Sequence, residues 1–460
     1  MESRAGERPD VATPAGPESG ASFRFVFEFA VALAIAATLF RGFVAEAYVV
    51  TSGSMAPVFF GYHKWIECPD CGHGFAVGAE EDCSCPVERR ACPNCGRRDL
   101  DVEGKPVSTG DRVLILKAIF DHRPLRRWEL AVFRGDEAPR QAFVKRIVGL
   151  PGESVQLRRG DIYIDGKIAR KTWAELRSTR IPVYEEPSPA NDDVARRVWN
   201  IEPAGAGSRD AQGWTKLAGK GAKATLRSFD GEGKPTELRD RLPYNPDGAD
   251  WLFQPIDDFG IEGEFRIDGR ASIILSPRRG PPLRLVLDKD DAALWRGDAK
   301  LANGTMQLPQ SGFRLEFATW DRLVGVRVNG ADLFPPVELP DEDAGETGST
   351  TPVRFEVEGG ECAWRGIRVC RDVYYTTKVG TNWPLAAVDE PVKLGPDEYF
   401  ALGDNSAASR DARLWRRPGT PARALLGKPV LLHYPGKAIA IGHGGRTLQA
   451  PNFRRWGRIP

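Results

Sequence analysis

The most apolar stretch of the chain begins at Phe23 and reads FRFVFEFAVALAIAATLFRGFVAEAYVV. Its cleanest part, residues 29–40, is shorter than the roughly 20 residues that cross a bilayer as a helix. Counting from Phe23, with the Arg24 side chain reaching back to the interface, the length suffices. We therefore predict a retained transmembrane anchor over residues 23–45. A disordered tail rich in Ala, Gly, Pro, Glu and Ser is expected before it, over residues 1–22.

A buried core helix and a cleaved signal peptide are the two other interpretations of this stretch. No small-residue cleavage site follows it cleanly, and the chain runs directly into the motif TSGSM. Charge does not set its orientation in a membrane, because Arg4, Arg8 and Arg24 precede the segment while Arg41 follows it.

After the anchor, short apolar runs alternate with Gly, Pro and Asp turns, a pattern that predicts β-strands. The strands are expected within residues 110–117, 129–134, 142–150, 153–169 and 398–405. The unit GDIYIDGK is typical of a hairpin with Asp-Gly as its turn. Together with 49 glycines and 36 prolines, this pattern predicts a mainly β fold behind one transmembrane helix.

The composition and the strand pattern of the chain change over residues 172–375, which we call the long insert. Its early part, to about residue 250, contains stretches rich in Gly, Lys and Ser, such as KLAGKGAKA. Many strands at short spacing follow, among them RLVGVRVNGADLF, a hairpin on an Asn-Gly turn. This spacing predicts a β-sandwich. The pattern loosely resembles laminin-G or concanavalin-like domains, a likeness of fold that implies no ligand.

Length and charge narrow the function classes only slightly. A chain of 460 residues is long enough for two to four domains. Its net charge of +1, with both signs interspersed, does not indicate a nucleic-acid partner. None of the five histidines lies in a catalytic-triad context, so a serine hydrolase of this sequence needs another base.

Six of the eight cysteines cluster between Cys68 and Cys95. The pairs Cys68/Cys71 and Cys92/Cys95 each form a Cys-Pro-x-Cys-Gly turn, and two such turns supply the four thiolates of a tetrahedral zinc site. We therefore predict a zinc-ribbon-like insert with structural zinc over residues 62–107, called the cysteine segment below. The alternative is disulfide bonding, which an extracytoplasmic location favours.

The remaining cysteines leave alternatives open. Cys83 and Cys85 are either substitute metal ligands or a separate pair, and His73 is expected at the surface rather than on the metal. Cys362 and Cys370, within the long insert, are either buried thiols or a disulfide.

Three motifs far apart in the chain carry the candidate chemistry: TSGSM (51–55), FVKRIVGLPGE (143–153) and GDNSAASRDAR (403–413). A serine hydroxyl is a weak nucleophile without a base. Lysine serves as that base only when its amine is neutral, and desolvation lowers a lysine pKa because it disfavours the cation. Lys145 lies in an apolar run, although a lysine on a strand usually faces solvent.

In this order the motifs resemble those of type I signal peptidases, membrane-anchored serine proteases with a Ser/Lys dyad. RGFVAEAYVVTSGSMAP resembles the family's anchor-to-nucleophile segment, and GDRVLILK resembles its next box. ELAVFR followed by FVKRIVGLPGE resembles the box with the general base, and YFALGDNSAASRDAR resembles the last box. GKPVLLHYP and FRRWGRIP resemble the closing segment. The likeness covers the anchor and residues 41–60, 108–170 and 385–460, less than half of the chain.

The resemblance implies a role for each matching residue. Ser54 matches the nucleophile and Lys145 the general base. Ser52 matches the side-chain donor of the oxyanion hole, which acts with the Ser54 backbone N–H. The serine that orients the lysine is matched by Ser409. The pair that supports the site is matched by Asp411 and Arg413. Four structural positions are matched by Arg146, Gly403, Asp404 and Asn405.

Three positions depart from the family pattern. Thr51 stands where proline is frequent, Ser406 where arginine is usual, and Ala412 where serine is usual. Without the resemblance, the serines of TSGSM would be turn formers and the Asp/Arg pair of the last motif an ordinary ion pair.

The resemblance implies an endopeptidase that removes N-terminal signal peptides from exported preproteins. Its core would comprise residues 46–171 and 376–460, interrupted by the two inserts, and would lie outside the cytoplasm on a single-pass anchor. Implied partners are preprotein signal peptides and the lipid bilayer, with a protein or glycan ligand for the long insert and no cofactor for catalysis.

Two other functions fit the sequence less well. A Ser/Lys peptidase of the self-cleaving repressor type conflicts with the anchor, because such proteins work in the cytosol. A membrane-tethered binding or scaffold protein with a degenerate protease core conflicts with the intact Ser54, Lys145 and Ser52.

Overall fold

The structure is a computed structural model. Part of the predicted tail, residues 1–18, lies outside the described residues, as do Cys83 and Cys85. The described ranges are 19–79, 89–135, 140–186, 192–230, 232–239, 241–245, 255–309, 311–340, 350–377, 385–434, 436–440 and 447–459.

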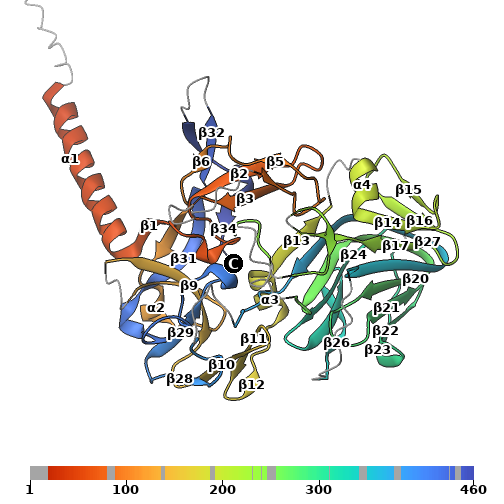
Figure 1. The fold of residues 1–460 in the computed structure, drawn as a ribbon. Coiled ribbons are helices and arrows are strands. Elements are labelled where there is room, and N and C mark those ends of the chain that lie inside the picture. Colours follow the sequence, from red (N-terminus) through yellow and green to blue (C-terminus); the bar gives the residue numbers. More distant parts are fainter. Residues whose placement is uncertain are drawn as a thin grey trace, which may run out of the picture.

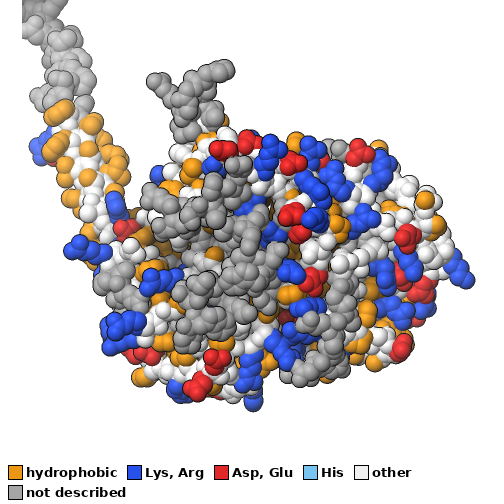
Figure 2. Space-filling view, viewed as in Figure 1, with side chains coloured by type: hydrophobic (Ala, Val, Ile, Leu, Met, Phe, Trp, Pro, Cys, Tyr) orange, Lys and Arg blue, Asp and Glu red, His pale blue; other side chains and the backbone are white. Residues whose placement is uncertain are grey.

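The predicted anchor is a helix. Helix α1 (Ser19–Leu39) continues into a π-helical turn, η1 (Phe40–Val44). The span Phe23–Val44 has a mean hydropathy of 1.9 and is not buried against the rest of the chain. It projects from the body with apolar side chains along its length (Figures 1 and 2). An apolar, unpacked helix of this length fits a single-pass membrane anchor.

The predicted core is built on an eight-stranded sheet whose strands come from both ends of the chain. The sheet places β9 between β8 and β29, so Lys145 lies opposite Ala131 while Arg146 lies opposite Leu402. This pairing brings the second and third motifs together, and it confirms the strands predicted in both. The spatial order is β1 (Ala45–Val49), β7 (Arg112–Leu116), β31 (Leu425–Tyr434), β8 (Leu130–Arg134), β9 (Ala142–Gly149), β29 (Glu398–Leu402) and β30 (Gly419–Pro421), with β34 (Gly457–Arg458) beside β31.

A second, four-stranded sheet extends the core. Its spatial order is β12 (Lys167–Ile168), β11 (Asp161–Ile164), β10 (Ser154–Arg158) and β28 (Val392–Lys393). Asp165 and Gly166 join β11 to β12 with φ angles of 47° and 80°. Both angles are left-handed, as a type I′ turn requires, which confirms the predicted Asp-Gly hairpin.

The cysteine segment consists of two short sheets. One has the order β3 (Gly74–Gly78), β2 (His63–Glu67) and β6 (Val107–Ser108), and the other pairs β4 (Arg89–Arg90) with β5 (Leu100–Asp101). Each Cys-x-x-Cys turn lies between the strands of one hairpin, so the two turns are carried by similar local structures.

The long insert is dominated by a branched sheet of thirteen strands. Its two longest strands, β20 (Phe259–Leu275) and β27 (Val353–Arg371), pair along most of their length. The first half of β20 also pairs with β24 (Phe313–Trp320), and its second half pairs with β21 (Leu283–Asp288). Apolar side chains from both branches, including Phe265 and Phe317, are fully buried in one core. Figure 1 shows the insert beside the core sheet. The likeness to laminin-G domains stays a prediction.

The other strands of the insert follow the same pattern. The predicted Asn-Gly hairpin is confirmed, because Asn329 and Gly330 have φ angles of 50° and 84° between the two paired strands β25 and β26. The strands not yet given are β13 (Ile181–Glu185), β14 (Trp199–Glu202), β15 (Gly207–Arg209), β16 (Thr215–Ala218), β17 (Lys223–Leu226), β18 (Ser228–Phe229), β19 (Pro235–Thr236), β22 (Asp291–Arg296), β23 (Ala299–Thr305), β25 (Leu323–Val328) and β26 (Ala331–Glu338).

The early part of the insert holds more regular structure than its Gly- and Lys-rich composition indicated. Leu217 and Leu226 are buried on strands β16 and β17, and Gly219 and Gly221 form the turn between them with φ angles of 101° and 79°. The glycines therefore mark a tight turn rather than a loop. The insert also contains two short helices, α3 (Trp173–Thr179) and α4 (Asp192–Val198). Outside the insert, the remaining elements are helix α2 (Ile119–His122) and a separate pair of strands, β32 (Gly436–Ala440) and β33 (Thr447–Pro451).

Candidate active site

The first motif forms a tight turn directly after the first strand of the core. Strand β1 ends at Val49, and Gly53–Met55 form a 3-10 turn, η2. Met55 is fully buried and anchors the turn, whereas Ser54 is half-buried and Ser52 is exposed. The Ser52 hydroxyl lies 3.4 Å from the Ser54 hydroxyl. Both side chains are therefore available at the same surface.

The second motif places a lysine inside the protein. Lys145 is only 2% exposed, in contrast to the solvent-facing position usual for a lysine on a strand. Its Nζ donates a hydrogen bond of 3.0 Å to Ser409 Oγ. Burial lowers the pKa of Lys145 to about 8, with Arg413 assisting and Asp411 and Asp404 opposing the shift. At that pKa about a tenth of the amine is neutral at pH 7.

The third motif is a buried loop that follows β29. Asp411 and Arg413 form an ion pair of 2.7 Å with both side chains inaccessible to solvent. Burial alone would raise the pKa of Asp411, but Arg413 and the hydrogen bond from Gly403 N hold it below its usual value. The pair is thus a fixed, fully ionised support close to the amine of Lys145.

Ser406 is part of this support although it departs from the family pattern. Its hydroxyl accepts hydrogen bonds from Thr376 N (2.8 Å) and from Arg413 Nη1 (2.9 Å). Arg413 also donates to the Thr376 carbonyl at 2.7 Å. Ser406 therefore ties the third motif to the chain that returns from the long insert. No feature of the sequence marks Thr376 as a partner.

Arg146 and Asp404 form a second buried ion pair. Arg146 donates to both carboxylate oxygens of Asp404, at 2.8 and 2.6 Å. It also donates to the carbonyl of Trp128 and to that of Ser178, in α3. The pair fixes the start of the third motif against the strand that carries Lys145.

Gly403 is the point where the three motifs meet. A Cβ at this position would come within 3.0 Å of both Ser409 Oγ and the Ser54 carbonyl oxygen. Asn405 N donates to that same Ser54 oxygen at 3.1 Å. Ser54 and the Lys145–Ser409 pair are therefore neighbours across a position that has no room for a side chain.

The structure brings the six residues predicted for catalysis and its support into three hydrogen-bonded pairs: Ser52–Ser54, Lys145–Ser409 and Asp411–Arg413. Among the described residues, no hydrogen bond joins Ser54 directly to Lys145, whose amine is bonded to Ser409 instead. Catalytic hydrogen bonds are often long before substrate binds and shorten in the complex. The arrangement can perform base-assisted attack once the Ser54 side chain turns toward the amine.

Comparisons with known proteins match part of the chain to signal peptidases. A family model described as signal peptidase, peptidase S26, matches residues 104–203. Signal peptidase I from Leptolyngbya laminosa is 37% identical over 76 residues, which is 15% of this chain and 37% of that protein. Probable signal peptidase I-2 from Synechocystis sp. is 38% identical over 68 residues, 14% of this chain and 31% of that protein. The resemblance to type I signal peptidases is confirmed.

The similarity to signal peptidases covers only part of this chain and part of each relative. The chain spans about a third of the length of the curated relatives it matches. The family match includes Lys145 but not Ser54 or the third motif. A solved carbohydrate-binding module from Bacillus subtilis is 9% identical and aligns with 37% of this chain and 92% of that one, at a TM-score of 0.25. Such a score does not test the predicted fold of the insert.

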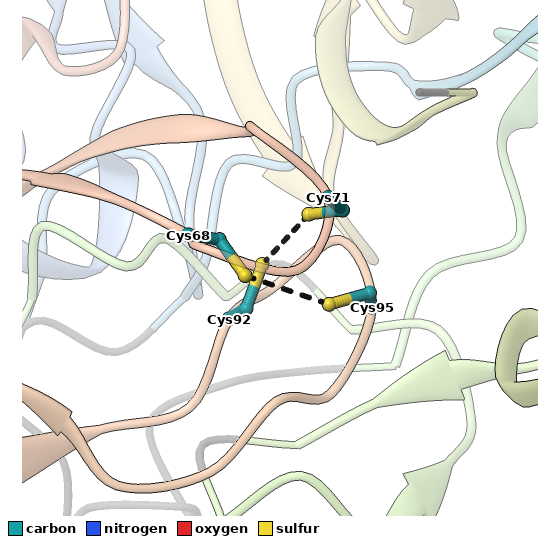
Figure 3. A group of neighbouring side chains, drawn as sticks. All are labelled: Cys68, Cys71, Cys92 and Cys95. Atoms are coloured by element: carbon teal, nitrogen blue, oxygen red, sulfur yellow. Dashed lines mark hydrogen bonds between the residues drawn. The ribbon is translucent and has the colours of Figure 1, made fainter. Parts of the chain in front are cut away.

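The signal-peptidase-like core carries a four-cysteine cluster in its cysteine segment (Figure 3). The sulfur atoms of Cys68, Cys71, Cys92 and Cys95 all lie within 4.8 Å of one another. Two of the separations are 3.7 and 3.6 Å. A disulfide requires about 2.05 Å. Four sulfurs at about 2.3 Å from one zinc ion stand about 3.8 Å apart, so the cluster fits a tetrahedral metal site.

The turns around the cluster are those expected of metal-binding knuckles. Gly72 and Gly96 follow the two Cys-x-x-Cys pairs with φ angles of 67° and 69°, which confirms the predicted glycine turns. His73 is not part of the cluster.

The two cysteines of the insert are buried thiols, and the disulfide alternative is wrong. Cys362 and Cys370 are both unpaired on strand β27. Burial raises the pKa of each to about 12, so neither is reactive.

Proposed function

We propose that this chain is a membrane-bound serine endopeptidase that removes N-terminal signal peptides from exported preproteins. One observation carries the proposal: the amine of Lys145 is desolvated, and it is bonded to Ser409 beside the turn that holds Ser54. A buried lysine without a carboxylate in hydrogen-bonding contact is poised to lose its proton near neutral pH. A buried lysine with a structural role would be paired instead, as Lys171 is with Asp321 and Asp372.

The chemistry follows from these positions. Neutral Lys145 takes the proton of the Ser54 hydroxyl, and the Ser54 oxygen attacks the scissile carbonyl of the preprotein. The resulting oxyanion accepts hydrogen bonds from the Ser54 backbone N–H and from the Ser52 hydroxyl. Protonated Lys145 then passes its proton to the leaving amine. Water, deprotonated by the same lysine, releases the signal peptide from the acyl-enzyme.

Three residues support this base without touching substrate. Ser409 accepts a hydrogen bond from the Lys145 amine and so aims it toward the Ser54 turn. Asp411 and Arg413 hold the loop that carries Ser409 through a buried ion pair. Because Asp411 raises the pKa of Lys145 while Arg413 lowers it, the two charges of the pair act on the lysine in opposite directions.

The anchor and the cysteine segment complete the proposed enzyme. Because β1 starts directly after η1, the Ser54 turn stays close to the bilayer surface, where a signal peptide would also lie. Catalysis would take place outside the cytoplasm. The cysteine cluster would hold a structural zinc ion rather than one used in catalysis, because all four sulfurs are available as ligands and no position is left for a substrate. A protein or glycan ligand of the long insert is a further prediction.

Preprotein cleavage by the full-length chain in detergent or liposomes tests the proposal. Ser54→Ala and Lys145→Ala are each expected to lower cleavage by about a thousandfold or more without unfolding the protein. Lys167→Ala, which removes an exposed lysine on β12, is the matched control and should cleave at the wild-type rate. A folded wild-type protein that cleaves no preprotein would instead favour a tethered binding protein with a degenerate core.

A further inference from the structure

Residues 241–245 of the long insert lie against the turn that carries Ser54. A Cβ at Gly53 would collide with the ring of Tyr244. That ring is stacked on Phe60, with 5.7 Å between centroids and 7° between planes. Its hydroxyl donates to the Tyr62 carbonyl at 2.8 Å, and the Tyr244 carbonyl accepts from Gly78 N at 2.9 Å. The insert is therefore packed onto the nucleophile turn and held there from several sides.

The next residue of this loop, Asn245, reaches the third motif. Asn245 Nδ2 donates to Asn405 Oδ1 at 2.8 Å, and Asn405 Nδ2 donates to Asn245 Oδ1 at 2.7 Å. The side chains are 5% and 1% exposed, so water does not replace these bonds. Arg90 of the cysteine segment donates to the Asn245 carbonyl at 2.8 Å and fixes its backbone. Two asparagines 160 residues apart in sequence thus form a closed, reciprocal pair.

The other amide hydrogen of Asn405 is used on the nucleophile turn. Asn405 Nδ2 donates to the Gly53 carbonyl oxygen at 3.0 Å. That oxygen is an acceptor only, so the atom facing it must be the nitrogen, and the remaining Asn405 oxygen must face a donor. Asn245 Nδ2 is that donor. The Gly53 carbonyl thus selects this orientation of the Asn405 amide, and Asn245 Nδ2 satisfies the amide oxygen that this orientation leaves buried.

Asn405 in turn sets the direction of the proposed oxyanion donor. The Gly53 carbonyl and the Ser54 N–H belong to one planar peptide unit and point in opposite directions. Holding the Gly53 oxygen therefore aims the Ser54 N–H. Asn405 also donates its own backbone N–H to the Ser54 carbonyl at 3.1 Å, which fixes the following peptide unit. Both peptide units that flank Ser54 are thus held by Asn405.

We propose that Asn245 is a positioning residue for this active site, supplied by the long insert. It keeps the Asn405 amide in the orientation that aims the Ser54 N–H at the oxyanion. The inference rests on the proposed peptidase function. Without Asn245, the buried oxygen of the Asn405 amide loses its donor, so the amide can move away from the Gly53 carbonyl and the oxyanion donor loses its alignment.

Preprotein cleavage by full-length Asn245→Ala, Asn245→Asp and Asn200→Ala variants tests the proposal. Asn200 is the matched control, because its amide bonds to Arg227 and Glu202 within the insert. Removing one oxyanion donor lowers kcat by roughly 100- to 1000-fold in serine proteases, so a misaimed donor should lower it about tenfold or more. We expect that loss for Asn245→Ala, with KM changed by less than about threefold and an unshifted pH profile.

The second variant tests the donor itself. Asn245→Asp keeps an oxygen that accepts from Asn405 Nδ2 but removes the donor to Asn405 Oδ1, so at a matched melting temperature it should lose kcat about as Asn245→Ala does. Wild-type kcat in Asn245→Ala would overturn the inference and leave the peptidase function intact. Wild-type kcat in Asn245→Asp, or a loss in Asn245→Ala accompanied by a shifted pH profile, would also overturn it. A wild-type protein without cleavage activity would overturn both proposals.

Discussion

A pH titration of preprotein cleavage examines the state of Lys145 directly. Burial lowers the pKa of this amine to about 8, and only the neutral form can accept the Ser54 proton. The neutral fraction is then about 1% at pH 6, about 10% at pH 7 and about 50% at pH 8. We therefore expect kcat/KM to rise about tenfold per pH unit below pH 8 and to level off above it.

The assay uses initial rates at low substrate concentration, because kcat/KM reports the ionisation of the free enzyme. The substrate should lack histidine near its cleavage site, so that only the enzyme titrates. A limb below pH 6.5 would refute the lysine assignment in favour of a histidine, since burial lowers the pKa of His63, His73 and His433. A limb near pH 10.5 would mean that Lys145 is solvated in the working enzyme.

The same pKa has a consequence for stability. The folded pKa lies below the unfolded value of 10.5, so the unfolded chain binds the proton more tightly. The resulting destabilisation is fully present below about pH 8 and disappears as the pH rises toward 10.5. A shift of this size corresponds to about 3 kcal/mol. Lys145→Met should therefore abolish cleavage without lowering the melting temperature at pH 7. A lower melting temperature would contradict the interpretation of Lys145 as a desolvated amine without a carboxylate partner.

Three further outcomes follow from the geometry. Ser409→Ala removes the acceptor of the Lys145 amine and should lower kcat/KM by about tenfold to a hundredfold, because general-base catalysis contributes at least that much. Gly403→Ala should abolish cleavage, because its Cβ would collide with the Ser409 hydroxyl, while Gly457→Ala, which has open space around it, should not. Cys92→Ser should reduce bound zinc, measured by elemental analysis, from about one ion per chain to less than about half an ion per chain. It should also lower the melting temperature. Wild-type protein that binds no zinc would contradict the predicted metal site.

The local features of this fold could be predicted because they depend on short stretches of chain. The type I′ turn at Asp165–Gly166 needs two residues that tolerate left-handed φ angles, and the four-cysteine cluster needs only two similar turns. The residues of the three motifs could be matched for the same reason. Their spacing within each motif is short, and their order along the chain is retained.

Contacts between distant segments could not be predicted in this way. Asn245 and Asn405 meet through tertiary packing, and an asparagine in a Gly- and Pro-rich stretch has the composition of an ordinary turn. The partner of Ser406 is a backbone group of Thr376, which no side-chain pattern can reveal. The burial of Lys145 likewise depends on β29, a strand more than 200 residues away in the sequence.

The two ends of the long insert are joined by a buried ion pair. Lys171 lies directly before the insert, and its amine contacts Asp372 at 2.8 Å and Asp321 at 2.5 Å, with both contacts out of solvent. A few residues later, Tyr375 N donates to the Gly160 carbonyl at 3.1 Å, so the returning chain meets the hairpin that it left.

This closure changes what the insertion means for folding. A flexible loop of about 200 residues in place of a tight turn would add about 3 kcal/mol of closure entropy to the core. Because the insert folds on itself and its ends are clamped together, the core experiences a connection only a few residues long. Strand β29, which pairs with the strand that carries Lys145, can then join the sheet as if it were close to that strand in sequence. For the folding of the core, the insert is therefore equivalent to a short, rigid connection rather than to a long flexible linker.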